Sequence, residues 1–177
     1  EGLPVVPKIG LSFQIDKKYS NLQWYGRGPH ESYIDRKHSA FLGRYSGTVR
    51  DQYYPYIRPQ ENGNKTDIRW VSISDEKGSG VLIYGLPAFN FSAHQYSLDN
   101  LTKSTHTYMI EDDGPTTVNL DHMVMGLGGD DSWNPRTHKE YLIPPGSYSY
   151  SFTLRFSDNI KVDGQRTFDN RLSKLSS

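Results

Sequence analysis

The sequence predicts an all-β domain built as an antiparallel β-sandwich. Aromatic residues are abundant, with 13 Tyr, 7 Phe and 3 Trp, and this bias favours strands over helices. Short stretches alternate apolar and polar side chains, and turn-forming Gly, Pro, Asn and Asp separate them. Such spacing of short strands is typical of a sandwich or barrel, and nothing in it suggests a parallel α/β sheet.

The length of 177 residues fits one domain, and the start at Glu1 rather than at a methionine leads us to expect a piece of a longer polypeptide. We expect residues 1–160 to form this domain. Residues 161–177 are polar and lack alternation, so we expect them to be a frayed tail.

The first half of the chain contains four predicted strands. Two of them, Lys8–Ile15 and Leu22–Tyr25, lie near the beginning. The next two, Asp67–Ser74 and Val81–Tyr84, flank a glycine-containing turn and predict a hairpin. Glu31–Arg36 is the only helix candidate in this half.

The second half continues the pattern. We expect strands at Phe89–Ala93, Thr105–Ile110 and Thr116–Met125, and a short helix at Ser97–Lys103. The clearest alternation in the chain then runs from Tyr148 to Phe156, where every even position is apolar or aromatic. Two prolines and a glycine precede it, so the sequence predicts a C-terminal hairpin of Lys139–Leu142 with Tyr148–Phe156.

Charge and cysteine content exclude several classes of function. The chain has 20 basic and 20 acidic residues, so no net field would recruit nucleic acid or an anionic membrane. No apolar run approaches the roughly 20 residues that a membrane helix needs. The absence of cysteine excludes disulfides, thiolate metal sites and thiol nucleophiles. The expected partner is therefore a neutral molecule, not a nucleic acid or a membrane.

The residues do not predict a catalytic site. The sequence lacks a Gly-x-Ser-x-Gly elbow, a phosphate-binding glycine loop and a His-Glu-x-x-His motif. Asp130 and Asp131 are adjacent, so in an extended chain they point apart, whereas a glycosidase pair must face one bond across about 5 to 9 Å. We interpret them as residues that cap a turn and orient Ser132 and Trp133.

Histidines do not predict a metal site either. His94, His106 and His122 lie on three different predicted strands and share no ligand spacing with each other or with a nearby carboxylate. We therefore expect hydrogen-bonded packing residues and no metal ligands in this chain.

One loop remains as a candidate binding site. Gly126-Leu127-Gly128-Gly129 permits unusual backbone angles, and Trp133 follows with few apolar neighbours before Asn134-Pro135. An indole held in this way is suited to stack on the C–H face of a pyranose ring. A tryptophan that folds back over its own sandwich is the alternative that the residues leave open.

Three long motifs resemble a known family, namely the C-terminal domain of bacterial β-galactosidases of glycoside hydrolase family 2. The first motif is Trp24-Tyr-Gly-Arg-Gly-Pro-His-Glu-Ser-Tyr-Ile-Asp-Arg36, and the second is Tyr54-Pro-Tyr-Ile-Arg-Pro-Gln-Glu-Asn-Gly-Asn64. The third is Met125-Gly-Leu-Gly-Gly-Asp-Asp-Ser-Trp133. The resemblance extends from about Pro7 to Phe156.

The resemblance implies a fold and a role. The chain is similar to the later part of a galactose-mutarotase-like supersandwich, and the parent enzyme hydrolyses terminal β-D-galactosides such as lactose by a retaining mechanism. The catalytic glutamates, with Mg and Na ions, belong to a (β/α)₈ barrel outside this chain, so the fragment has no catalytic residue of its own and needs no cofactor. Trp133 matches the family's substrate-stacking tryptophan, with Asp130, Asp131 and Ser132 as its supporting loop.

The family also implies partners for the parent enzyme. They are a β-galactoside sugar, the remaining domains, and further copies in a homo-oligomer, in the cytoplasm or periplasm of a bacterium. For the charged and polar residues of the first two motifs we expect buried ion pairs and contacts between domains.

Two other readings stay open at this point. One is a free-standing carbohydrate-binding module that uses Trp133. The other is a mutarotase-like isomerase, which would pair His94 or His122 with Glu111 in a cleft lined by the sheet.

Overall fold

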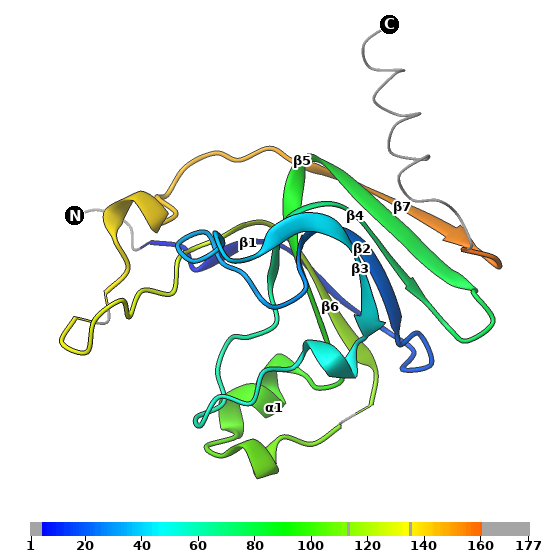
Figure 1. The fold of residues 1–177 in the computed structure, drawn as a ribbon, viewed down its shortest axis with the longest axis horizontal. Helices are drawn as coiled ribbons and strands as arrows, with labels where there is room; N and C mark the ends of the chain where they lie inside the picture. The colour runs from blue at the N-terminus through cyan, green and yellow to red at the C-terminus, as the bar shows by residue number, and fades with distance from the viewer. Residues whose placement is uncertain (1–4, 113, 135, 161–177) are drawn as a thin grey trace, which may run out of the picture.

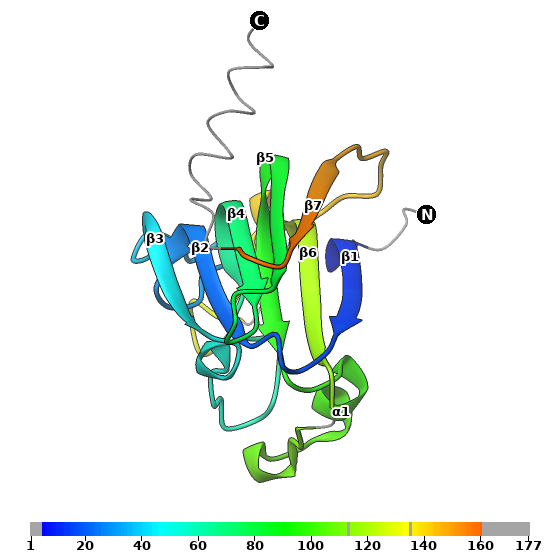
Figure 2. The same cartoon turned by 90° about the vertical axis from the view of Figure 1, so that its right-hand side faces the viewer.

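The chain folds around one antiparallel sheet. The structure is a computed structural model that describes residues 5–112, 114–134 and 136–160. Within these residues seven strands join in the order β1-β6-β5-β4-β2-β3, with β7 paired to β5 (Figures 1 and 2). The strands are β1 (Lys8–Ile15), β2 (Asn21–Gly28), β3 (Phe41–Thr48), β4 (Lys65–Ser74), β5 (Gly80–His94), β6 (Thr116–Val124) and β7 (Ser151–Ser157). The predicted all-β, antiparallel class is confirmed.

Strand β5 is the branch point of the sheet. Its first part, Gly80–Leu86, pairs with β7, and its last part, Asn90–His94, pairs with β6. The sequence predicted two strands here, Val81–Tyr84 and Phe89–Ala93, and this prediction is wrong because they form one continuous strand. Pro87 lies where β5 changes partner, so its missing N–H costs the sheet no ladder hydrogen bond.

The branching creates the two layers that enclose the core. The core residues come mainly from alternate positions of the central strands, such as Ile83, Phe91 and Leu120. Phe152 on β7 and Phe13 on β1 pack against the same cluster from the two branches. The arrangement is consistent with the predicted all-β sandwich.

The last predicted hairpin is wrong. Lys139–Tyr141 forms a 3-10 helix, η3, and β7 pairs with β5 instead of with this segment. The open edge of β5 offers seven paired residues and lets Phe152 and Leu154 reach the core, which residues 139–142 cannot match. Thr105–Ile110 is likewise not a strand, since it contains the 3-10 helix η2 (Thr107–Met109).

Strand β3 was not predicted. It contains Gly43, Gly47 and Arg44 and lacks apolar alternation, but it pairs with β2 over its full eight residues. Of the two helix candidates, Ser97–Lys103 is confirmed as α1 (Leu98–Lys103), where the Ser97 hydroxyl accepts a hydrogen bond from the Asn100 N–H at 3.1 Å. Glu31–Arg36 forms a turn with an isolated bridge between Tyr33 and Arg36 instead of a helix.

A third 3-10 helix, η1 (Arg50–Gln52), follows β3. Across the part of the chain that the structure describes, no helix is long and apolar enough to span a membrane. The predicted tail, residues 161–177, lies outside the described residues.

Candidate functional site

The loop that carries Trp133 begins directly after β6. Gly128 and Gly129 have φ values of 68° and 75°, in the left-handed region that glycine adopts without strain. The loop leaves the body of the sheet, and Trp133 is 94% exposed. The alternative in which this tryptophan folds back over the sandwich is therefore wrong for this chain.

Asp131 organises the tip of this loop. Its Oδ1 accepts hydrogen bonds from the backbone N–H groups of Trp133, at 2.7 Å, and Asn134, at 2.5 Å. The Asn134 side-chain oxygen then accepts one from the Arg136 N–H at 3.2 Å. These contacts form an Asx-type turn that fixes the backbone on which the indole is mounted.

Asp130 points to a different partner. Its Oδ2 lies 2.9 Å from Nε2 of His138, which follows the loop tip in sequence. This contact therefore joins the two sides of the loop. The hydrogen bond from His138 lowers the pKa of Asp130, and the same contact raises the pKa of His138. Both acids therefore contact groups of the loop itself. Ser132 lies between Asp131 and Trp133 and is exposed.

The base of the loop is held to the body of the domain. Asp35 Oδ2 accepts a hydrogen bond from the Gly128 N–H at 2.8 Å, across 93 residues of sequence. Gly126 donates to the Tyr141 carbonyl at 2.9 Å, and its own carbonyl accepts from the Thr137 hydroxyl at 2.8 Å. A Cβ on Gly126 would lie 2.7 Å from Asp35 Oδ2, so a glycine is needed for this approach. The base of the loop is therefore fixed to the domain, whereas its tip projects into solvent.

The first two motifs meet in a second polar region, which we call the inner network and define by Glu31, Tyr56, Asn62 and Gly63. Glu31 accepts a short hydrogen bond from the Tyr56 hydroxyl and another from the Gly63 N–H at 2.8 Å. Asn62 accepts from the Tyr54 N–H at 3.1 Å and donates to the Gln60 carbonyl and the Tyr96 hydroxyl. Burial, with the hydrogen bond to Glu31 next, raises the pKa of Tyr56 to about 12.

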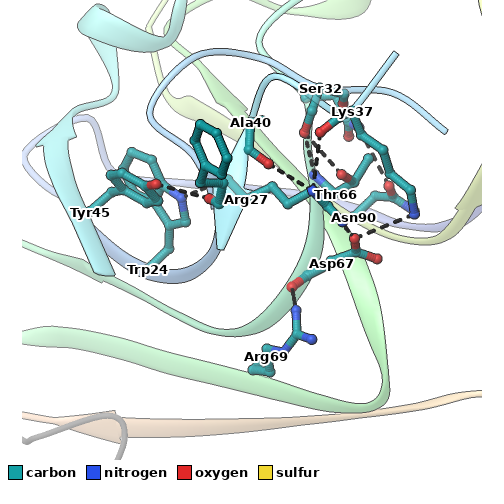
Figure 3. Close-up of polar contacts among 12 residues, drawn as sticks. Trp24, Arg27, Ser32, Lys37, Ala40, Tyr45, Thr66, Asp67, Arg69 and Asn90 are labelled. Atoms are coloured by element: carbon teal, nitrogen blue, oxygen red, sulfur yellow. Dashed lines mark hydrogen bonds and ion pairs between the residues drawn. The ribbon is translucent and has the colours of Figure 1, made fainter. Parts of the chain in front are cut away.

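The two motifs are thus joined by hydrogen bonds, whereas ion pairs were expected between them. Arg27 pairs with Asp67, which belongs to neither motif, at 2.5 Å, and it also donates to the carbonyls of Ala40 and Lys37 (Figure 3). Burial raises the pKa of Asp67, but the hydrogen bonds from Arg27 and Lys37 outweigh it and the net shift is downward. Asp67 also has φ 56°, an unusual value for a residue with a side chain.

Asp35 is the site residue that sequence reasoning did not identify. It was grouped with the charges of the first motif, since nothing in the local pattern shows that its partner is 93 residues away. A separation of this size is decided by tertiary packing.

The histidines occupy separate places. His94 is buried, its ring stacks on Tyr96 with centroids 4.7 Å apart, and its Nε2 lies 3.0 Å from the Asn62 carbonyl. His122 stacks on Tyr150 instead. His94 and Glu111 line one cavity of about 270 Å³, while His122 lies elsewhere. Among the described residues, no three His, Asp or Glu side chains gather as metal ligands.

Comparison with known proteins gives a consistent result. Residues 2–154 match a family model described as "Beta galactosidase small chain". The chain is 45% identical over 156 residues to a β-galactosidase of Priestia megaterium, and 44% over 153 residues to one of Pseudoalteromonas haloplanktis. These alignments cover 88% and 86% of this chain, but only 15% and 14% of the relatives. The chain thus spans about 15% of the length of the curated relatives that it matches.

Proposed function

This chain belongs to the β-galactosidase small chain family, and from that premise we propose that it is the C-terminal domain of a larger β-galactosidase. In this proposal the parent enzyme hydrolyses terminal β-D-galactosides by a retaining mechanism, through a covalent galactosyl-enzyme. The two catalytic carboxylates, and any Mg or Na ions, belong to another domain of the polypeptide. The small share of the relatives that this chain covers supports a division of labour between domains.

One observation carries the role of this domain, namely the exposure of Trp133. An indole that is 94% exposed on a loop with a fixed base is not needed for the fold of the chain that presents it. Its flat apolar face suits the C–H face of a pyranose, and its N–H remains able to hydrogen-bond. We infer that Trp133 stacks on the substrate or leaving-group sugar when a catalytic domain stands opposite the loop.

Asp131 and Asp130 support this role by geometry and not by chemistry. Asp131 accepts two backbone hydrogen bonds at the turn, and Asp130 contacts His138. A carboxylate used in this way fixes the backbone that carries the indole, which reduces the backbone entropy lost when sugar binds.

A chimera tests the proposal. The matching segment of the Priestia megaterium β-galactosidase would be replaced by this chain, and hydrolysis of an aryl β-galactoside and transfer to an acceptor sugar would be measured. We expect the chimera to be active, and Trp133→Ala to raise KM and reduce acceptor transfer by about tenfold, the value of one lost stacking contact.

Tyr108→Ala is the matched control, because Tyr108 is also a highly exposed aromatic residue, at 81%, but lies in η2 away from the loop. Unchanged KM and acceptor transfer in Trp133→Ala would reject the stacking role. An active Trp133→Ala chimera with normal stability but altered sugar kinetics would support it.

The exposed Trp133 also suits the second candidate, a free-standing carbohydrate-binding module. Calorimetric titration of the isolated chain with galactosides separates the two. A flat titration rejects the module, while saturable binding that Trp133→Ala abolishes favours it.

A further inference from the structure

A small cavity lined by both polar and apolar side chains lies on the face of the sheet opposite the apolar core. It has a volume of about 100 Å³ and is enclosed between β1, β5, β6 and the side chains of α1. The polar residues that line it include Lys8, Glu61, Ser92, His94, Thr117 and Asn119. The alternation of β6 explains the polarity, because Val118 and Leu120 point into the core and Thr117 and Asn119 point the opposite way.

Two buried polar atoms of this lining have no hydrogen-bond partner among the residues that the structure describes: Nδ1 of His94 and Oγ1 of Thr117. Nε2 of His94 lies 3.0 Å from the Asn62 carbonyl, which can only accept, so Nε2 carries the hydrogen and Nδ1 is an acceptor. Burial also lowers the pKa of His94 to about 4, so the ring is neutral near pH 7. A buried acceptor and a buried hydroxyl without partners call for a ligand or water.

The remaining lining offers both kinds of hydrogen-bonding group. The Asn119 amide donates to Ser92 Oγ at 3.0 Å, which leaves the Ser92 hydroxyl hydrogen and the Asn119 carbonyl oxygen for a further partner. Glu61 supplies a carboxyl group and Lys8 an ammonium, so the charges of the lining balance. Burial raises the pKa of Glu61, with Lys8 opposing the shift.

We propose that this cavity binds a neutral polyhydroxylated molecule, either a small polyol or the hydroxyl-bearing edge of a sugar. A hydroxyl donates and accepts at once, which matches a lining that presents both unpaired acceptors and unpaired donors. A ligand with a net charge would meet no excess of opposite charge in the lining, because Lys8 and Glu61 balance each other. The cavity volume is about that of three water molecules in the liquid, and it accommodates a three-carbon polyol.

The cavity is separate from the Trp133 loop. It adjoins α1 and the first half of β6, whereas the loop follows the opposite end of β6 (Figure 1). The site therefore does not depend on the proposed role of Trp133, and either can fail without the other.

The experiment is a titration of the ¹⁵N-labelled chain with glycerol and with galactose, followed by amide chemical shifts. We expect saturable changes, with millimolar affinity, confined to the surroundings of His94, Thr117 and Asn119. Thr117→Val, which removes the hydroxyl and keeps the shape, should weaken binding about fivefold, the effect of one hydrogen bond. Trp133→Ala should titrate like the unmodified chain.

Two controls make the result decisive. Tert-butanol has a similar size and one hydroxyl, and it should produce no saturable shift at these residues. Ser92→Ala replaces Thr117→Val if the latter loses its circular-dichroism signature. The proposal is overturned by the absence of saturable shifts, by a folded lining variant that binds as tightly as the unmodified chain, or by binding that Trp133→Ala removes.

Discussion

The inner network and the Trp133 loop both consist of family motifs, but they use their polar groups in opposite ways. In the inner network, Glu31 and Asn62 bind groups from distant parts of the chain, and Asn62 is buried while Glu31 is half-buried. In the loop, Asp131 binds only its own neighbours in sequence, and the side chain that it positions faces solvent. A recognisable motif can therefore serve stability in one place and presentation of a binding group in another.

The difference follows from where the hydrogen-bond partners come from. A hydrogen bond between distant segments couples the stability of those segments, because breaking it leaves a buried polar group unpaired. Short-range partners keep a loop shaped even when nothing packs against it. The two regions should thus respond differently to the same kind of mutation.

The largest expected contrast is between two glycines. Gly63 has φ 74°, and a Cβ there would lie 2.5 Å from the Gln52 carbonyl oxygen and 2.8 Å from Cε1 of His94. Gly63→Ala should therefore cost about 3 to 5 kcal/mol of unfolding free energy, from strain and overpacking together.

Gly129→Ala is the matched variant in the loop. Its φ is 75°, but a Cβ would meet nothing within 4 Å, so only the backbone cost of about 1 kcal/mol should appear. Urea unfolding of both variants measures the contrast. Equal losses would show that the inner network relaxes around a methyl group and is not rigid.

The second contrast is the pH dependence of two histidines. Burial lowers the pKa of His94 from 6.5 to about 4, so below pH 6.5 the unfolded chain binds a proton that the folded chain does not. Its contribution is complete above pH 6.5 and is lost as the pH falls toward 4, by on the order of 3 kcal/mol.

The measurement is the stability difference between the unmodified chain and His94→Gln, at about pH 7.5 and about pH 5. Asp121, whose pKa burial raises to about 6, acts in the opposite direction but is common to both proteins and cancels. His138 is exposed, so solvent screens its contact with Asp130, and His138→Gln should change the profile far less than His94→Gln does. A His94→Gln chain with the same acid sensitivity as the original would contradict the assignment.

The smallest expected effect is that of Trp133→Ala on stability. Because the side chain is 94% exposed, its removal should change the unfolding free energy by less than about 0.5 kcal/mol. Thermal unfolding followed by circular dichroism tests this. A loss above about 1 kcal/mol would mean that the indole packs on the domain and is not presented outward.

Much of the fold followed from local patterns. Strands β1, β4 and β6 were predicted from local alternation, and each contributes apolar side chains to the core. The helix candidate Ser97–Lys103 was confirmed as α1, and the structure shows that the Ser97 side chain caps it. The loop was also found from sequence, since its glycines and the isolated Trp133 need no partner elsewhere to be recognised.

Other features depended on distant segments. The pairing of β7 with β5 and the strand at Phe41–Thr48 arise from open sheet edges, which local alternation does not encode. The hydrogen bond of Asp35 to Gly128 and the unpaired atoms of His94 and Thr117 likewise exist only after the strands assemble.

The all-β class, the three motifs and the single tryptophan in a polar loop can be read from local patterns, because side-chain period and turn chemistry act over a few residues. The exposure of Trp133, the contact by which Asp35 holds its loop, and the cavity that side chains of three strands line arise from tertiary packing. These outcomes depend on which edges and faces meet, and that choice is made by burial across the whole chain.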